Sequence, residues 1–115
     1  MPDDVADLDL ICIPEAAQAL GVPTTRIHQW IRDGALLAVR DESGERRVPA
    51  ALIQGSAVVK GLSGVVTLLR DGGYADDEIV TWLFRSDDSL PGTPIQALRD
   101  NRGREVKRRA QVAGY

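Results

Sequence analysis

The feature that most constrains the fold is a pair of short helical patterns between residues 14 and 33. The first pattern, PEAAQALG, begins with a proline, which a first helical turn tolerates, and ends with a glycine, which favours a left-handed stop. The second, residues 24–33, carries one apolar stripe at helical spacing and is followed by Gly34. This stripe consists of Ile27, Trp30 and Ile31. The sequence therefore predicts two helices joined by a turn at residues 21–23.

The second pattern also has a polar face. It consists of Thr25, His28, Gln29 and Arg32, with Thr24 and Arg26 beside it at the first turn. In a helix-turn-helix, the second helix enters the major groove of DNA, where such side chains contact base edges and phosphates. The alternative is an ordinary amphipathic helix pair with a solvated polar face, and the spacing alone favours neither interpretation.

A strand-like run, a polar turn and a second strand-like run follow directly. Strands are predicted over residues 37–40 and 46–48, with the bend at Ser43-Gly44. A hairpin directly after a recognition helix is a wing, and this one carries Arg40, Arg46 and Arg47. We expect these arginines to lie on the DNA backbone or to enter the minor groove. The alternative is that they are solvated hairpin residues beside two nearby glutamates.

The rest of the chain predicts short helices and loops. One helix is capped by Ser63, one begins near Asp76 with Ile79, Trp82 and Leu83 facing inward, and two more cover residues 94–99 and 102–112. Residues 54–62 fit either a strand or a connecting helix, and residues 86–93 predict a loop. The basic face of the last helix is either solvated, which we favour, or a second phosphate-contacting surface.

These elements predict a mainly α protein with a small β-hairpin wing, a winged helix-turn-helix followed by a small C-terminal helical domain. We expect an acidic, flexible N-terminal tail over residues 1–12, the winged helix-turn-helix DNA-binding domain over 13–53 and the C-terminal helical domain over 54–115.

Charge and composition exclude several classes of protein. The net charge is −3, but basic charge is concentrated in residues 96–115, which hold six bases against two acids. No segment has the pattern of a signal peptide or a membrane span, so we expect a cytoplasmic protein with no membrane partner. One cysteine and one histidine predict no disulfide and no metal site, and no cofactor fingerprint or catalytic constellation is present. An enzyme is therefore not expected.

Several short motifs identify relatives of the N-terminal unit. They are Glu15-Ala16-Ala17, Leu20-Gly21-Val22, the apolar triad, Gly34 and Arg40. This combination resembles the winged helix-turn-helix of the excisionase and MerR-like superfamily. The chain departs from that pattern at Pro23, where many members have a serine. The usual N-cap is therefore lost, and we expect Thr24 or Thr25 to take part of its role.

Further landmarks extend through the chain from about residue 10 onward. They are Leu20-Gly21-Val22-Pro23, Ala38-Val39-Arg40, Asp71-Gly72-Gly73-Tyr74, Trp82-Leu83-Phe84, Pro94-Ile95 and Arg104-Glu105-Val106. They resemble a small actinobacterial family of winged-helix DNA-binding proteins, which in mycobacteria includes transcriptional regulators that are substrates of a membrane Ser/Thr kinase. The resemblance implies double-stranded DNA and a Ser/Thr protein kinase as partners. Residues 1–23 contain no serine or threonine, so phosphorylation of the tail has no acceptor here.

Two other functions fit parts of the sequence. The segment LPGTPIQALRDNRGREV is similar to the C-terminal domain of some antitoxins, which favours a protein-interaction module. An excisionase-like architectural factor that bends DNA is the alternative within the DNA-binding class. A monomer and a dimer are both compatible with the sequence, because it contains no long heptad zipper.

Overall fold

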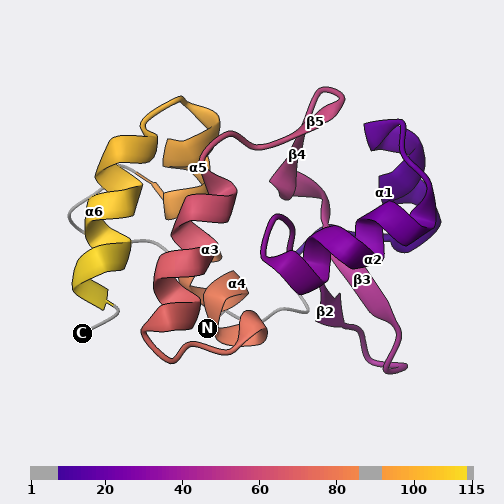
Figure 1. Ribbon diagram of the computed structural model, residues 1–115, viewed down its shortest axis with the longest axis horizontal. Helices are drawn as coiled ribbons and strands as arrows, with labels where there is room; N and C mark the ends of the chain where they lie inside the picture. Colours follow the sequence, from indigo (N-terminus) through magenta and orange to yellow (C-terminus); the bar gives the residue numbers. More distant parts are fainter. Residues whose placement is uncertain (1–7, 86–91, 114–115) are drawn as a thin grey trace.

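The structure is a computed structural model in which residues 8–85 and 92–113 are described. Six α-helices and five short strands lie in these ranges (Figure 1). In chain order they are β1 (Leu10–Cys12), α1 (Ile13–Leu20), α2 (Thr24–Asp33), β2 (Val39–Arg40), β3 (Arg46–Pro49), the 3-10 helix η2 (Ala50–Leu52), β4 (Ile53–Gln54), β5 (Ala57–Val58), α3 (Leu62–Asp71), α4 (Asp76–Phe84), α5 (Pro94–Arg99) and α6 (Gly103–Ala113).

The two predicted N-terminal helices are present. Helix α2 has the predicted bounds, and its inward residues Ile27 and Ile31 are buried. Burial of an isoleucine contributes about 1.5–3 kcal/mol relative to exposure, so these two side chains hold α2 against the core. Gly21 ends α1 at a φ of +69° and Gly34 ends α2 at +84°, both in the left-handed region that favours glycine.

The wing belongs to a three-stranded antiparallel sheet in the order β1-β3-β2. Strand β1 was not predicted, because Leu10–Cys12 were expected to belong to the tail. They instead pair with β3, with Ile11 opposite Val48 and Cys12 opposite Arg47. The pairing gives these apolar residues a half-buried place in the sheet. Strand β2 is also shorter than predicted, because Leu36 and Leu37 are fully buried outside any strand.

The region that the sequence left open forms a second, two-stranded hairpin. Strand β4 pairs antiparallel with β5, with Ile53 opposite Val58, and Gly55 in the turn has a φ of +66°. Of the two alternatives, the strand is therefore correct. The hairpin joins the winged helix-turn-helix to the C-terminal unit, by which we mean α3 to α6 (Figure 1).

The C-terminal unit contains the predicted helices with two corrections. Helix α3 begins at Leu62 after Gly61, whose φ is +90°, so Ser63 is not its N-cap. In α4 the buried residues are Ile79, Val80 and Leu83, whereas Trp82, predicted to face inward, packs against the core but is only half-buried. Most of the predicted loop, residues 86–91, lies outside the described residues. Helix α6 packs beside α3 and buries Val106 and Ala110 (Figure 1).

One hydrophobic core joins the two units. It extends from Ile13 in α1 through Ile27 in α2 and Leu69 in α3 to Ala110 in α6. Within the described ranges no polar side chain is fully buried and no helix is long and apolar enough to cross a membrane. The winged helix-turn-helix therefore rests directly on the C-terminal helices.

Candidate nucleic-acid interface

The predicted polar face of α2 is exposed in the structure. Because Ile27 and Ile31 point into the core, the opposite side of the helix faces solvent. We call the six exposed residues predicted to meet DNA the recognition face: Thr25, His28, Gln29 and Arg32 lie along the solvent side, with Thr24 and Arg26 beside them in the first turn. Asp33, in the last turn, is exposed as well. Among the described residues, none of the six side chains of the recognition face makes a hydrogen bond or an ion pair within the protein. Their donors and acceptors are therefore available to a ligand.

The N-terminus of α2 lacks a side-chain cap. Its N-cap residue is Pro23, and the predicted capping by Thr24 or Thr25 is wrong, because both residues already lie within the first turn. The carbonyl oxygen of Pro23 accepts from the N–H groups of Arg26 at 2.9 Å and Ile27 at 3.4 Å. This arrangement leaves the N–H groups of the two threonines without an acceptor among the described residues. Free N–H groups and the positive end of the helix dipole favour an anion such as phosphate.

The turn of the wing is organised around Asp41. One carboxylate oxygen accepts from the Ser43 hydroxyl at 2.6 Å and from the backbone N–H groups of Ser43 and Glu45 at 2.9 and 3.0 Å. The other oxygen accepts from Nε of Arg47 at 2.6 Å. The Ser43 hydroxyl, followed by the Arg47 guanidinium, holds the pKa of Asp41 well below its ordinary value. The same hydrogen bond raises the pKa of Arg47.

The three predicted wing arginines consequently have different surroundings. Arg47 is half-buried and paired with Asp41. A second carboxylate, that of Glu45, lies 3.7 Å from Nη2 of Arg47, and Arg47 therefore stabilises the turn. Arg40 and Arg46 lie directly opposite one another in the β2–β3 pairing. Arg40 donates to the Gly44 carbonyl at 2.8 Å, and Arg46 has no side-chain partner among the described residues.

Opposed like charges on one face of a hairpin destabilise it. In this wing the two guanidiniums of Arg40 and Arg46 belong to a cross-strand pair, and such pairs share a face of the sheet. An anion placed between them would relieve their repulsion. This pair is therefore the wing's candidate phosphate-binding element, adjacent in sequence to the recognition face.

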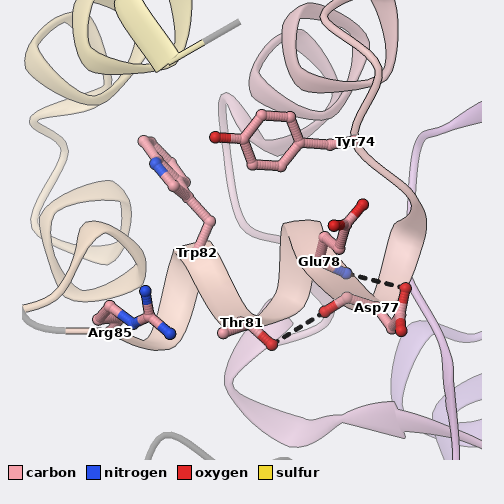
Figure 2. Close-up of a pocket in the computed structure, with 6 residues that line it drawn as sticks. All are labelled: Tyr74, Asp77, Glu78, Thr81, Trp82 and Arg85. Carbon is pink, nitrogen blue, oxygen red and sulfur yellow. Dashed lines mark hydrogen bonds between the residues drawn. The ribbon is translucent and has the colours of Figure 1, made fainter.

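The C-terminal unit carries a pocket of different character. It has a volume of about 280 Å³ and is lined by Tyr74, Asp77, Glu78, Thr81, Trp82 and Arg85 (Figure 2). The acidic groups serve α4 itself, because Glu78 accepts from the N–H of Ala75 at 2.8 Å and Asp77 accepts from the N–H of Glu78 at 3.0 Å. Two carboxylates against the one arginine give the lining a net negative charge that disfavours phosphate, so this pocket does not extend the candidate interface.

The sequence did not reveal one residue that contacts the end of α2. Arg70, in the last turn of α3, donates to the carbonyl oxygens of Ile31 and Arg32 at the end of α2. These contacts join residues 38 and 39 positions apart, and no local pattern in the sequence marks them.

The fold and the recognition face define a winged helix-turn-helix protein with an appended helical unit. Residues 2–53 match the family described as "DNA-binding protein Rv2175c, wHTH domain", and residues 59–114 match "Rv2175c C-terminal domain of unknown function". The chain therefore belongs to the Rv2175c family.

Two comparisons agree with this assignment. The DNA-binding protein Rv2175c of Mycobacterium tuberculosis (strain ATCC 25618 / H37Rv) is 40% identical over 127 residues, covering 98% of this chain and 87% of the relative. The NMR structure of Rv2175c superposes with a TM-score of 0.87 at 39% identity, covering 97% of this chain and 86% of that one. The predicted fold class, a mainly helical protein with a small wing, is confirmed.

Proposed function

We propose that this protein binds double-stranded DNA and regulates transcription in the cytoplasm, without enzymatic activity. The observation that carries the proposal is the recognition face, because its polar side chains are exposed, share one side of α2 and have no internal partner among the described residues. A solvated helix face would have the same exposure, but it would not need the adjacent wing with its opposed arginines. The name of the mycobacterial relative, DNA-binding protein Rv2175c, supports the same function.

Within this proposal the side chains have different tasks. Gln29 has the geometry to pair with an adenine edge, and Arg26 or Arg32 can reach guanine or phosphate from the same helix. His28 lies beside Gln29 on the recognition face and completes the surface presented to the groove. The free N–H groups and hydroxyls of Thr24 and Thr25 fit a phosphate at the start of α2.

The wing would contact the DNA backbone on the flank of the major groove. Arg40 and Arg46 are the arginines that we assign to phosphates, while Arg47 keeps the wing in shape through Asp41. We further propose that residues 13–53 are the DNA-binding domain and residues 54–115 the C-terminal domain, with β1 serving the former by pairing with β3.

The test is a fluorescence-anisotropy titration of labelled duplexes selected from a random-sequence pool with the wild-type protein. Wild type, Gln29→Ala and the control Gln111→Ala, an exposed glutamine on α6, are compared on the selected duplex and on a scrambled one. Loss of one base-reading contact should cost Gln29→Ala about 1–3 kcal/mol of discrimination between the two duplexes. The Gln111→Ala variant should behave as wild type.

Two results would contradict the proposal. One is the absence of binding to any duplex at about 50 mM salt, where phosphate contacts are strongest. Such a protein would be better explained as a protein-interaction module that uses the C-terminal unit. The other is unchanged discrimination between the selected and scrambled duplexes in Gln29→Ala, which would contradict the placement of α2 in the major groove.

The sequence resemblance to excisionases supports a narrower version of the same function, in which the protein bends its site. Mobility of circularly permuted duplexes measures bending, and position-dependent mobility of the complex is the result expected of an architectural factor. A position-independent mobility would leave transcriptional regulation as the role.

A Ser/Thr kinase partner, which the resemblance implies, has no acceptor in residues 1–23. Thr24 and Thr25 are the first hydroxyls of the chain, and both are exposed at the start of α2. A phosphate there would add a charge of about −1.5 to −2 to the surface proposed to meet DNA phosphates. Phosphorylation at this place would therefore weaken DNA binding, and mapping phosphorylated residues by mass spectrometry after kinase treatment tests the idea.

A further inference from the structure

The end of the recognition helix is held by a residue of the C-terminal unit. Arg70 Nη2 donates to the carbonyl oxygen of Ile31 at 3.0 Å, and Arg70 Nη1 donates to that of Arg32 at 3.1 Å. The last carbonyl groups of a helix have no partner within the helix, and they lie at the negative end of its dipole. The guanidinium therefore caps α2 with both hydrogen bonds and charge.

The guanidinium of Arg70 is itself fixed from its other side. Asp76, at the start of α4, accepts from Nε at 2.9 Å and from Nη2 at 2.8 Å, which is a bidentate pair. This pair raises the pKa of Arg70. A bidentate arginine–carboxylate pair sets an orientation as well as a distance. Helices α3 and α4 thus hold the cap rigidly against α2.

The chain packs closely around this contact. Gly34, which follows α2, is buried, and a Cβ atom added to it would lie 3.1 Å from Arg70 Nη1 and 3.5 Å from Val66 Cγ1. The C-terminal unit is therefore in van der Waals contact with the end of α2, and no side chain fits between them.

A second arginine joins the two units at a different place. Arg99, at the end of α5, donates from Nη1 to the carbonyl oxygens of Ala51 at 2.8 Å and Ile53 at 3.0 Å. Its own carbonyl accepts from Nε2 of Gln54 at 3.1 Å. This contact holds η2 and β4, which lie outside α2. Arg99 therefore attaches the two units without touching α2, whereas Arg70 contacts α2 directly.

We propose that the C-terminal unit, whose family is described as of unknown function, is a brace that sets the angle at which α2 meets DNA, with Arg70 as its positioning residue. The inference rests on the proposed function. Arg32 connects the two roles directly, because its side chain lies on the recognition face while its carbonyl oxygen accepts from Arg70. A change in this contact would rotate or loosen the end of α2 and misplace its base-reading side chains.

The experiment uses the full chain with Arg70→Met, Asp76→Asn and the matched control Arg99→Met. Methionine keeps the apolar stem of arginine as far as the position of Nε but removes all donors and the charge. Affinities for a duplex selected with wild type and for a scrambled duplex are measured well below the melting temperature of every variant. Amide hydrogen exchange at residues 31–35 is followed in the free proteins.

In Arg70→Met, preference for the selected duplex should fall by roughly tenfold or more, as expected when a base-reading contact is misplaced. Amides at residues 31–35 should exchange faster, because the end of the helix is no longer capped. Asp76→Asn should shift both measurements in the same direction by less. Arg99→Met should lower the melting temperature while leaving both the preference and the exchange at residues 31–35 near wild type.

The outcomes that overturn the brace differ from those that overturn DNA binding. Unchanged preference and exchange in Arg70→Met would refute the brace, as would an Arg99→Met variant that lost preference equally. Wild type that bound no duplex would refute the proposed function instead. In that case hydrogen exchange in Arg70→Met would still decide whether the C-terminal unit holds α2.

Discussion

Replacement of Arg46 in the wing should weaken DNA binding in a way that depends on salt. The side chain of Arg46 has no hydrogen-bond or ion-pair partner among the described residues and lies opposite Arg40, so Arg46→Gln should remove the proposed phosphate contact without breaking a side-chain interaction within the protein. Each lost phosphate contact lowers the slope of log affinity against log salt by about 0.9. Between about 50 and about 200 mM salt, wild-type affinity should therefore fall roughly 3.5-fold more than that of the variant.

The same change should not destabilise the free protein. It removes the repulsion between two opposed guanidiniums, a term of about 0.2–1 kcal/mol in cross-strand pairs, so the melting temperature should be equal or slightly higher. Weaker binding combined with equal or greater stability is the signature of a functional charge.

The matched control for Arg46→Gln is Arg108→Gln on α6. Arg108 is exposed, and its replacement changes the net charge by the same amount. Anisotropy titrations across a salt series should give Arg108→Gln the wild-type slope. An unchanged slope in Arg46→Gln would refute the assignment of the wing to DNA, and an equal reduction in Arg108→Gln would place α6 on DNA as well.

The remaining predictions concern the turn of the wing and the end of α2. Because the pKa of Asp41 is depressed in the folded protein, its stabilising contribution is present above its ordinary value of 3.8 and is lost as pH falls from there toward the folded pKa. The amide resonances of the turn should shift over that acidic range in wild type and shift less in Asp41→Asn, and identical titrations of the two proteins would contradict the assigned hydrogen bonds. Gly34→Ala should destabilise the protein by more than the ~1–2 kcal/mol expected of a left-handed alanine, because its Cβ would also crowd Arg70 Nη1 at 3.1 Å. The control is Gly21→Ala, at a left-handed position where an added Cβ would meet nothing within 4 Å. Thermal unfolding measures both variants, and an equal loss of stability in the two would show that Arg70 moves aside at no cost.

Local sequence patterns predicted the helices well. The bounds of α2 and α5 were predicted as they occur, because an apolar stripe or a proline start and a clear stop signal mark each one. Local patterns failed where burial was decided by distant residues. Val80 is fully buried whereas Trp82 is only half-buried against the core, and β1 forms only because β3 offers it a partner.

The sequence also identified the recognition face but could not rank the wing arginines. Arg46 and Arg47 are neighbours with the same side chain, and consecutive residues of a strand point to opposite faces. The turn then gives Arg47 the Asp41 carboxylate and leaves Arg46 without a partner among the described residues. A composition-based argument treats the two as equal.

The sequence by itself determined the orientation of α2, because Ile27 and Ile31 fix which side of this helix is buried and thereby which side chains face outward. Tertiary structure alone decided what holds that helix in place. Arg70 reaches the end of α2 across 38 residues of chain, and Arg99 reaches η2 and β4 across 46 to 48. Helical periodicity is encoded within a few residues, whereas a contact between distant segments depends on how the whole core packs.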